Sequence, residues 1–266
     1  MSPRDRVAGV DFSGAREAGK NIWIATGNVT GNGVRVATLE RAADLPGGAK
    51  EFTPALAALV ARVAGLSDHT IGFDFPFSLP RDLIEQRTWP AFVRAFAKEY
   101  VTPEDFRDRC RGLSGGKELK RRTDIDARVP WCAYNLRLYR QTWAGIRHVL
   151  YPLIADNTAR VIPMQTAQPG KPLIAEICPA SFLKQEGLYK PYKGRGPELR
   201  KSRENIVRTL IRRGLLSRVR GPMRQVILDN AGGDALDAVL SALAAARIDS
   251  PPPRDRYDRL ESRVYF

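Results

Sequence analysis

The stretch VAGVDFSG, residues 7–14, places four small or apolar residues directly before an aspartate and a turn on Ser13 and Gly14. Such an apolar run predicts a buried strand over residues 6–11. A carboxylate at the end of a buried strand is costly unless it is hydrogen-bonded, paired with a positive group or bound to a cation. Asp11 therefore needs a partner from elsewhere in the chain.

The segments that follow predict a mixed sheet built around this strand. Strand-like runs over 21–29 and 33–42 flank the turn TGNG, which predicts a three-stranded antiparallel meander. A helical pattern over 52–66 then leads to a buried strand over 69–75, and such a connection favours parallel pairing with the first strand. The remaining elements are a strand over 172–178, helices over 179–187, 198–213 and 234–248, and an irregular tail over 250–266 with a possible last strand.

Residues 80–155 do not continue the strand pattern. An aromatic stripe at helical spacing begins at Trp89, and Thr102 precedes Pro, Glu and Asp as at the start of a helix. We predict a helical lobe over 80–155, inserted in a single domain of residues 1–266. The order of elements predicts an RNase H-like α/β fold, in which a five-stranded mixed sheet (three antiparallel strands plus two parallel ones) is flanked by helices.

The composition points to an intracellular protein with polyanionic partners. The 266-residue chain has 43 Lys and Arg against 29 Asp and Glu, a formal charge of +14. A positive field of this size favours nucleic acids, although coding bias alone can also make a chain rich in arginine. Cys110, Cys132 and Cys178 form no C-x-x-C pair, so we expect reduced thiols. No membrane span or signal peptide is recognisable, which predicts a cytoplasmic protein.

Four aspartates form a candidate metal site. Asp11 and Asp74 lie in apolar strands, and if these strands are parallel neighbours ~4.8 Å apart, both carboxylates can reach one cation. Asp234 and Asp237 are three residues apart on the last predicted helix, so they share a face and can add oxygens to the same site. Carboxylate oxygens suit Mg²⁺ or Mn²⁺, and two such ions can clamp a phosphodiester during its hydrolysis.

Glu176 is a further lone acid in an apolar strand, and we predict that it joins this cluster or supports it. Each acid also has a structural interpretation. Asp234 could cap the helix with Asp237 in a capping box, and Asp11 could cap the turn at DFSG. Asp74 and Glu176 could pair with buried arginines. The delivery of acids by four separate elements favours one shared site.

The order of these motifs resembles two known groups of proteins. GVDFSG, an acid in the fourth strand and DALDAVLSAL are similar to the Holliday-junction resolvases of RuvC type and their RNase H-like relatives. GFDFPFSLP, RRTD (121–124), AEICPASFL and LESRVYF resemble the family called domain of unknown function 429, regarded as predicted RNase H-fold nucleases. The resemblance runs from residue 7 to the C-terminus.

The resemblance implies a metal-dependent nuclease, and resolvase-like relatives often form homodimers. Two positions depart from the pattern. The acid of the fourth strand is Asp74 where the resolvases carry a glutamate, and LESRVYF lacks a glycine after its glutamate. Asp74 has a shorter reach to a metal than a glutamate at the same position.

Basic and aromatic residues supply candidate contacts to nucleic acid. The basic ones lie within 195–224 and in KELKRRTD (117–124), and those we select are Arg200, Arg203, Arg208, Lys120, Arg121 and Arg122. Such runs are equally typical of solvated faces. Four aromatic residues could stack on bases, although their helical spacing favours core packing: Trp131, Tyr134, Tyr139 and Trp143. His69 and His148 are assigned no role.

These observations favour a divalent-metal-dependent nuclease that hydrolyses phosphodiester bonds of DNA or RNA. The sequence has no P-loop, no G-x-S-x-G elbow and no G-x-G-x-x-G turn. Two alternatives stay open. DFSG also resembles a phosphate loop of the actin-like and sugar-kinase superfamily, which would make the chain an ATP-binding protein. A catalytically silent module that binds nucleic acid or a partner is the other.

Overall fold

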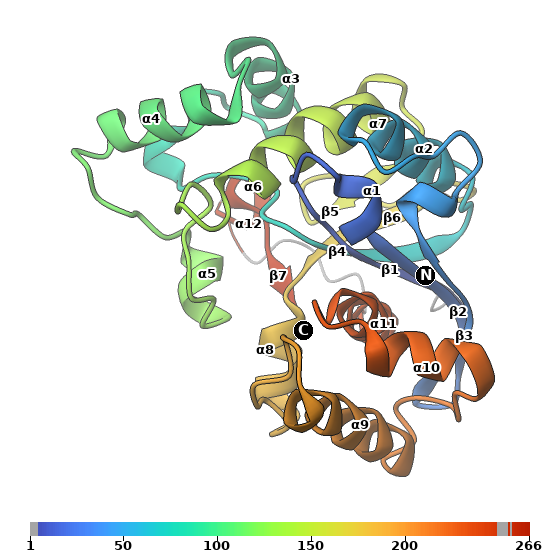
Figure 1. Ribbon diagram of the computed structural model, residues 1–266. Coiled ribbons are helices and arrows are strands. Elements are labelled where there is room, and N and C mark those ends of the chain that lie inside the picture. Colours follow the sequence, from blue (N-terminus) through green and yellow to red (C-terminus); the bar gives the residue numbers. More distant parts are fainter. Residues whose placement is uncertain (1–4, 249–254, 256) are drawn as a thin grey trace.

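The computed structural model describes residues 5–248, 255 and 257–266. Its centre is a mixed seven-stranded sheet with the strand order β3-β2-β1-β4-β6-β5, and β7 pairs with β6 (Figure 1). The strands are β1 (Arg6–Asp11), β2 (Trp23–Thr30), β3 (Gly33–Arg41), β4 (His69–Asp74), β5 (Arg160–Ile162), β6 (Leu173–Ile177) and β7 (Val264–Tyr265).

The predicted strand pairings are present. β2 is antiparallel to both β1 and β3, and β4 and β6 extend the sheet parallel to β1. The sheet has seven strands rather than the five predicted, because β5 and β7 both add to β6. β5 has only three residues, too few for a periodic pattern, whereas β7 is the anticipated last strand. The α/β class and the mixed sheet flanked by helices are confirmed, and the predicted number of strands was wrong.

Helices cover both faces of the sheet (Figure 1). One face carries α1 (Ala18–Asn21), η1 (Ala42–Asp44), α2 (Phe52–Ala64) and helices of the segment between β4 and β5. That segment contains η2 (Arg81–Leu83), α3 (Trp89–Glu99), α4 (Pro103–Leu113), α5 (Arg122–Asp126), α6 (Tyr139–Gly145), η3 (Ile146–Leu150) and α7 (Tyr151–Ala155). As predicted, Thr102 caps α4, and its Oγ1 accepts a hydrogen bond from the N–H of Asp105 at 3.1 Å.

The other face carries the helices that follow β6. They are α8 (Pro179–Gln185), α9 (Pro197–Arg212), α10 (Gly221–Asp229) and α11 (Asp234–Ala246), and a short α12 (Asp258–Glu261) precedes β7. In the part of the chain that the structure describes, no helix combines the length and apolarity needed to cross a membrane.

The alternation of β1 decides which residues face α11. Ala8 and Val10 pack in the core on the α2 side, whereas Val7 packs in the core on the α11 side. Because side chains alternate along a strand, Gly9 and Asp11 share the α11 face with Val7. The acid at the end of β1 is therefore directed toward the last long helix.

Two glycines let α11 lie directly on the sheet. Gly9 of β1 and Gly72 of β4 are register partners. A Cβ atom at Gly9 would overlap the backbone of Ala238, and one at Gly72 would lie 2.7 Å from the carbonyl oxygen of Ser241. Backbone therefore packs on backbone, which brings the first turn of α11 to the ends of β1 and β4.

Candidate metal centre

Three aspartates meet where β1 and β4 end and α11 begins. Asp11 and Asp74 are register partners at the ends of the two parallel strands. Asp237 comes from the first turn of α11. One carboxylate oxygen of each residue lies within 4.8 Å of those of the other two. Asp11, Asp74 and Asp237 thus come together as the sequence predicts, and they could hold a metal ion.

The loop before α11 fixes where this helix starts. Gly233 occupies the N-cap position with φ 80°, a left-handed conformation that glycine adopts without strain. Asn230 Oδ1 accepts a hydrogen bond from the N–H of Ala235 at 3.2 Å. Asp234 is the first helical residue and not the cap, so the capping-box interpretation of Asp234 and Asp237 is wrong.

Asp234 lies beside the three aspartates rather than among them. Its Oδ2 is 3.5 Å from Asn230 Nδ2, and the side chain is partly buried. The group of described acids that can reach one ion consists of Asp11, Asp74 and Asp237, without Asp234. The negative charge of Asp234 still helps to raise the pKa of Asp11. The prediction that Asp234 is a direct ligand is therefore not supported by the geometry.

The three-aspartate group is electrostatically strained without a cation. Burial, followed by repulsion from Asp237, raises the pKa of Asp74 to about 7. The same two causes raise the pKa of Asp11 well above its usual range. Three carboxylates in a buried space can all ionise only if positive charge compensates them. A divalent cation would supply that charge, so the donor set fits Mg²⁺ or Mn²⁺.

Tyr192 and Lys193, which the sequence did not suggest, complete the site. The Tyr192 hydroxyl donates a hydrogen bond of 2.6 Å to Asp237 Oδ1, and Lys193 Nζ lies 2.5 Å from Asp237 Oδ2. Although burial lowers it, attraction by Asp237 and Asp11 raises the pKa of Lys193 above its usual value. Both residues belong to a loop without periodicity, just before the basic run that begins at Arg195. The only available signal was the mixture of basic and aromatic residues in YKPYKGRG.

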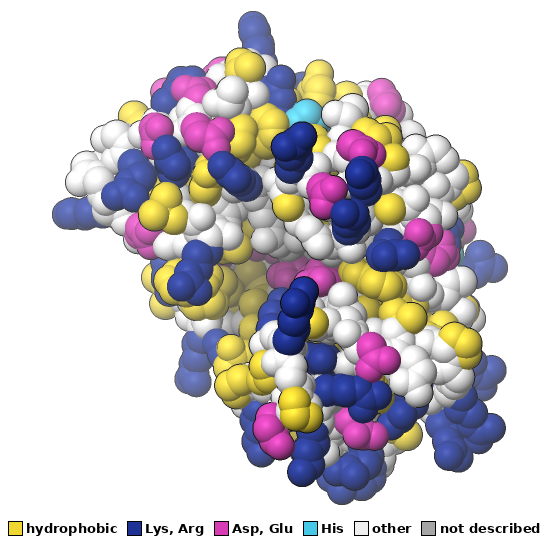
Figure 2. Space-filling model, viewed as in Figure 1, with side chains coloured by type: hydrophobic (Ala, Val, Ile, Leu, Met, Phe, Trp, Pro, Cys, Tyr) yellow, Lys and Arg dark blue, Asp and Glu magenta, His cyan; other side chains and the backbone are white. Residues whose placement is uncertain are grey.

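A cavity of about 280 Å³ opens beside the aspartates. Its lining includes Asp74, Asp237, Tyr192 and the two lysines, Lys190 and Lys193. Figure 2 shows a hollow across the middle of this face, with acidic side chains inside it and basic side chains at its edge. The site is therefore open to a ligand, with positive charge at its entrance and negative charge within.

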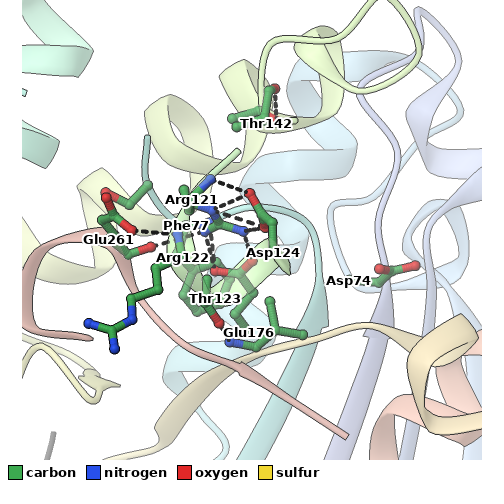
Figure 3. A network of polar contacts seen from close by, with 12 residues as sticks. Asp74, Phe77, Arg121, Arg122, Thr123, Asp124, Thr142, Glu176 and Glu261 are labelled. Atoms are coloured by element: carbon green, nitrogen blue, oxygen red, sulfur yellow. Dashed lines mark hydrogen bonds and ion pairs between the residues drawn. The ribbon is translucent and has the colours of Figure 1, made fainter. Parts of the chain in front are cut away.

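Glu176 faces the other side of the sheet. It pairs in register with Phe73 of β4, one residue before Asp74, and successive residues of a strand point to opposite faces. Its Oε1 accepts a hydrogen bond from Arg121 Nη2 at 2.5 Å, and its Oε2 accepts from Arg121 Nη1 at 2.8 Å. Figure 3 shows Glu176 and Arg121 directed toward each other, with Asp74 apart from them. The prediction that Glu176 joins the acidic cluster is wrong, and its alternative, pairing with a buried arginine, is correct.

Arg121 is the centre of a buried polar network (Figure 3). It also donates to Asp124 Oδ1 at 2.6 Å and to the carbonyl oxygen of Glu261 at 3.1 Å. The Glu261 carboxylate accepts hydrogen bonds from the backbone N–H groups of Arg81 and Arg122. The network therefore joins α5, β6 and the C-terminal segment.

Two of the predicted nucleic-acid contacts are buried. Arg121 is 1% exposed and is used by the network above. Arg203 is 2% exposed, and its guanidinium donates to the carbonyl oxygens of Leu228 and Tyr192. Neither guanidinium can bind a ligand at the surface, so both predictions were wrong. Arg203 instead supports the loop that carries Tyr192 and Lys193.

The other four predicted contacts, Lys120, Arg122, Arg200 and Arg208, reach the surface. Arg122 pairs with Asp255 at 2.8 Å and Arg200 pairs with Asp229 at 2.7 Å. Such pairs are weak enough at a surface for a polyanion to replace them.

The aromatic residues follow the core interpretation with one exception. Tyr134 and Tyr139 are buried, whereas Trp131 is 36% exposed. All three cysteines are free thiols, as predicted, and burial raises the pKa of Cys178 to about 11.

Comparison of the chain with protein-family models, curated proteins and solved structures gave no match.

Proposed function

We propose that this protein is a divalent-metal-dependent nuclease with an RNase H-like fold. The strand order supports the fold, since a three-stranded antiparallel meander is extended by β4 and β6, both parallel to β1. The observation that carries the function is the meeting of Asp11, Asp74 and Asp237 beside an open cavity, which Asp74 and Asp237 line. Fold alone would not justify it, because one fold serves many functions.

The residues of the site would have two roles, to hold a cation and to bind a phosphate. Asp11, Asp74 and Asp237 would hold the ion, and the Tyr192 hydroxyl fixes the orientation of Asp237. A bound Mg²⁺ or Mn²⁺ would stabilise negative charge on phosphoryl oxygens and favour ionisation of water. Lys193 is 53% exposed beside the buried Asp237, so its ammonium group can also contact a phosphate.

The surface supports a polyanionic substrate. Lys190 and Lys193 line the entrance of the cavity, and the chain carries a formal charge of +14. Lys120, Arg122, Arg200 and Arg208 add exposed positive charge that can attract a phosphate backbone through release of counterions.

The test is a cleavage assay with the purified full chain. Single-stranded DNA and RNA, both duplexes and a four-way junction would be incubated with Mn²⁺, Mg²⁺ or EDTA. We expect metal-dependent cleavage of at least one substrate, reduced about 100-fold or more by Asp11→Asn and by Asp237→Asn. Asp108→Asn is the matched control, because Asp108 is an exposed acid paired with Arg107 on α4.

Two results would contradict the proposal. If none of these substrates were cleaved in the presence of Mn²⁺, the protein would not be a nuclease that acts on them. Salt-sensitive DNA binding that survives Asp11→Asn would then favour a catalytically silent binding module. Stabilisation by ATP with Mg²⁺, but not by Mg²⁺ alone, would favour the ATP-binding alternative.

A further inference from the structure

A second cavity adjoins the candidate metal centre, and no lysine is among the described residues that line it. It measures about 140 Å³ and shares Asp74, Cys178 and Ala180 with the cavity beside the aspartates. The two cavities therefore meet at one of the three acids. A ligand with a phosphate at the aspartates can place a neighbouring group in this second cavity.

The size and walls of the second cavity suit one flat ring. A protein cavity of about 150 Å³ lined by apolar side chains is large enough to bind benzene. The walls here are mainly apolar and include Phe75, Pro76, Pro130 and Trp131. A six-membered ring fits this volume, and the fused rings of a purine fit it less closely.

Gln141 supplies a polar group at the cavity wall. Its side-chain N–H donates to the backbone carbonyl oxygen of Asp74, which fixes the direction of the amide. Within the described part of the chain, its Oε1 accepts no hydrogen bond, so this oxygen can accept one from a ring N–H or an exocyclic amine. Arg121 and Glu176 also line the cavity, but they are paired with each other. The cavity thus combines mainly apolar walls and this ion pair with the oriented acceptor of Gln141, an arrangement that suits recognition of a base.

Trp131 offers an aromatic surface at the same place. It lines the cavity, is 36% exposed, and has the Arg137 guanidinium 4.9 Å from its ring centroid. An exposed tryptophan beside a positive charge is the combination on which unpaired bases stack in proteins that bind single strands.

We propose that this cavity binds a pyrimidine base of the nucleotide whose phosphate lies at the three aspartates. The inference rests on the proposed function, and it gives that function a substrate class, an unpaired strand or a flipped nucleotide with a pyrimidine next to the reacting phosphate. A base can enter the cavity only after it leaves the stack of a duplex.

The experiment measures base-dependent binding separately from cleavage. Isothermal titration calorimetry with the full chain and Mg²⁺ would compare thymidine 5′-monophosphate and uridine 5′-monophosphate with 2′-deoxyadenosine 5′-monophosphate and 2′-deoxyribose 5-phosphate. We expect the pyrimidine nucleotides to bind about tenfold more tightly than the sugar phosphate, as base stacking on one aromatic residue allows. The adenine nucleotide should exceed the sugar phosphate in affinity by a smaller factor.

Variants assign that difference to the cavity. Trp131→Ala removes the aromatic surface, and Val129→Phe, at another wall residue, fills the space. Both should abolish the preference for the pyrimidine nucleotides and leave binding of the sugar phosphate unchanged. Tyr151→Ala is the matched control, because Tyr151 is 38% exposed on α7 and does not line the cavity.

Equal binding of all four ligands, or a preference that both variants retain, would overturn the inference. A pyrimidine preference that needs Trp131, in a protein that cleaves no nucleic acid, would support the base site while contradicting the nuclease. Metal-dependent cleavage without any preference for pyrimidines would support the nuclease and contradict the base site.

Discussion

Lys193 Nζ lies 2.5 Å from Asp237 Oδ2, although the lysine side chain is 53% exposed and the aspartate side chain only 1%. The exposed ammonium group of Lys193 therefore neutralises part of the negative charge of the buried aspartates. If the proposed metal binds, the lysine would compete with it for the same carboxylate and would be free to contact a phosphate instead.

Replacing Lys193 should separate metal binding from catalysis. In Lys193→Met the three aspartates lose a positive neighbour, so we expect about three- to tenfold tighter Mg²⁺ binding. Cleavage by the proposed nuclease should fall about tenfold or more, because the proposed contact of Lys193 with the phosphate would be lost. Calorimetry and the cleavage assay measure the two effects. Lys190→Met, a change at another lysine of the cavity, should leave Mg²⁺ affinity within about twofold of the wild-type value.

The raised pKa of Asp74, about 7, predicts a pH-dependent stability of the metal-free protein. Between its ordinary value of 3.8 and about 7, the folded state binds more protons than the unfolded state, so the free energy of unfolding falls as pH rises. From pH 6 to pH 8 we expect Asp74 to contribute a loss on the order of 1 kcal/mol, and Asp74→Asn should remove this contribution. Urea unfolding in EDTA at both pH values measures it.

Bound metal should oppose this loss of stability at high pH, because it binds the ionised carboxylates. The increase in melting temperature on adding Mg²⁺ should be larger at pH 8 than at pH 6, and absent in Asp74→Asn. An equal increase at both pH values would show that the group is already ionised without metal.

The close packing of α11 gives a prediction for the geometry of the centre. Gly9→Ala would place a methyl group in the backbone of Ala238 and should destabilise the protein by about 1–3 kcal/mol. Displacement of α11 should also weaken Mg²⁺ binding. Gly112→Ala is the control. Among the described residues, no atom outside the adjoining backbone of the helix lies within 4 Å of a Cβ there. Alanine also suits the helix better than glycine by about 0.5–1 kcal/mol. Urea unfolding of both variants tests the pair.

Much of the fold and the centre of the site can be predicted from the local pattern of apolar and acidic residues in the sequence. Apolar runs locate β1, β4 and β6, and the hairpin and crossover rules give their directions. Asp11 and Asp74 could be paired because each lies at the end of a buried strand and the two strands are parallel neighbours. The spacing of Asp234 and Asp237 showed that they share a helix face but not which of them reaches the sheet. The position of Gly233 decides that, since it makes Asp234 the first helical residue.

The remaining features depend on contacts between distant segments. Glu176 and Asp74 have the same local pattern, a lone acid in an apolar run, yet a shift of one residue in register places them on opposite faces. No local pattern shows that Arg121, 55 residues away, meets Glu176. Lys193 was missed for the same reason, because its role comes from α11 rather than from its own loop.

The buried pair of Arg121 and Glu176 gives the last prediction, which separates a structural acid from a metal ligand. Glu176→Gln would leave the guanidinium, 1% exposed, with Asp124 as its remaining ion-pair partner, and should destabilise the protein by about 3 kcal/mol. Arg122→Met breaks the neighbouring exposed pair with Asp255 and should cost at most about 1 kcal/mol. Urea unfolding compares the two variants. Because Glu176 faces away from the three aspartates, the Mg²⁺ affinity of folded Glu176→Gln should stay within about threefold of the wild-type value, and a loss as large as that of Asp237→Asn would return Glu176 to the metal centre.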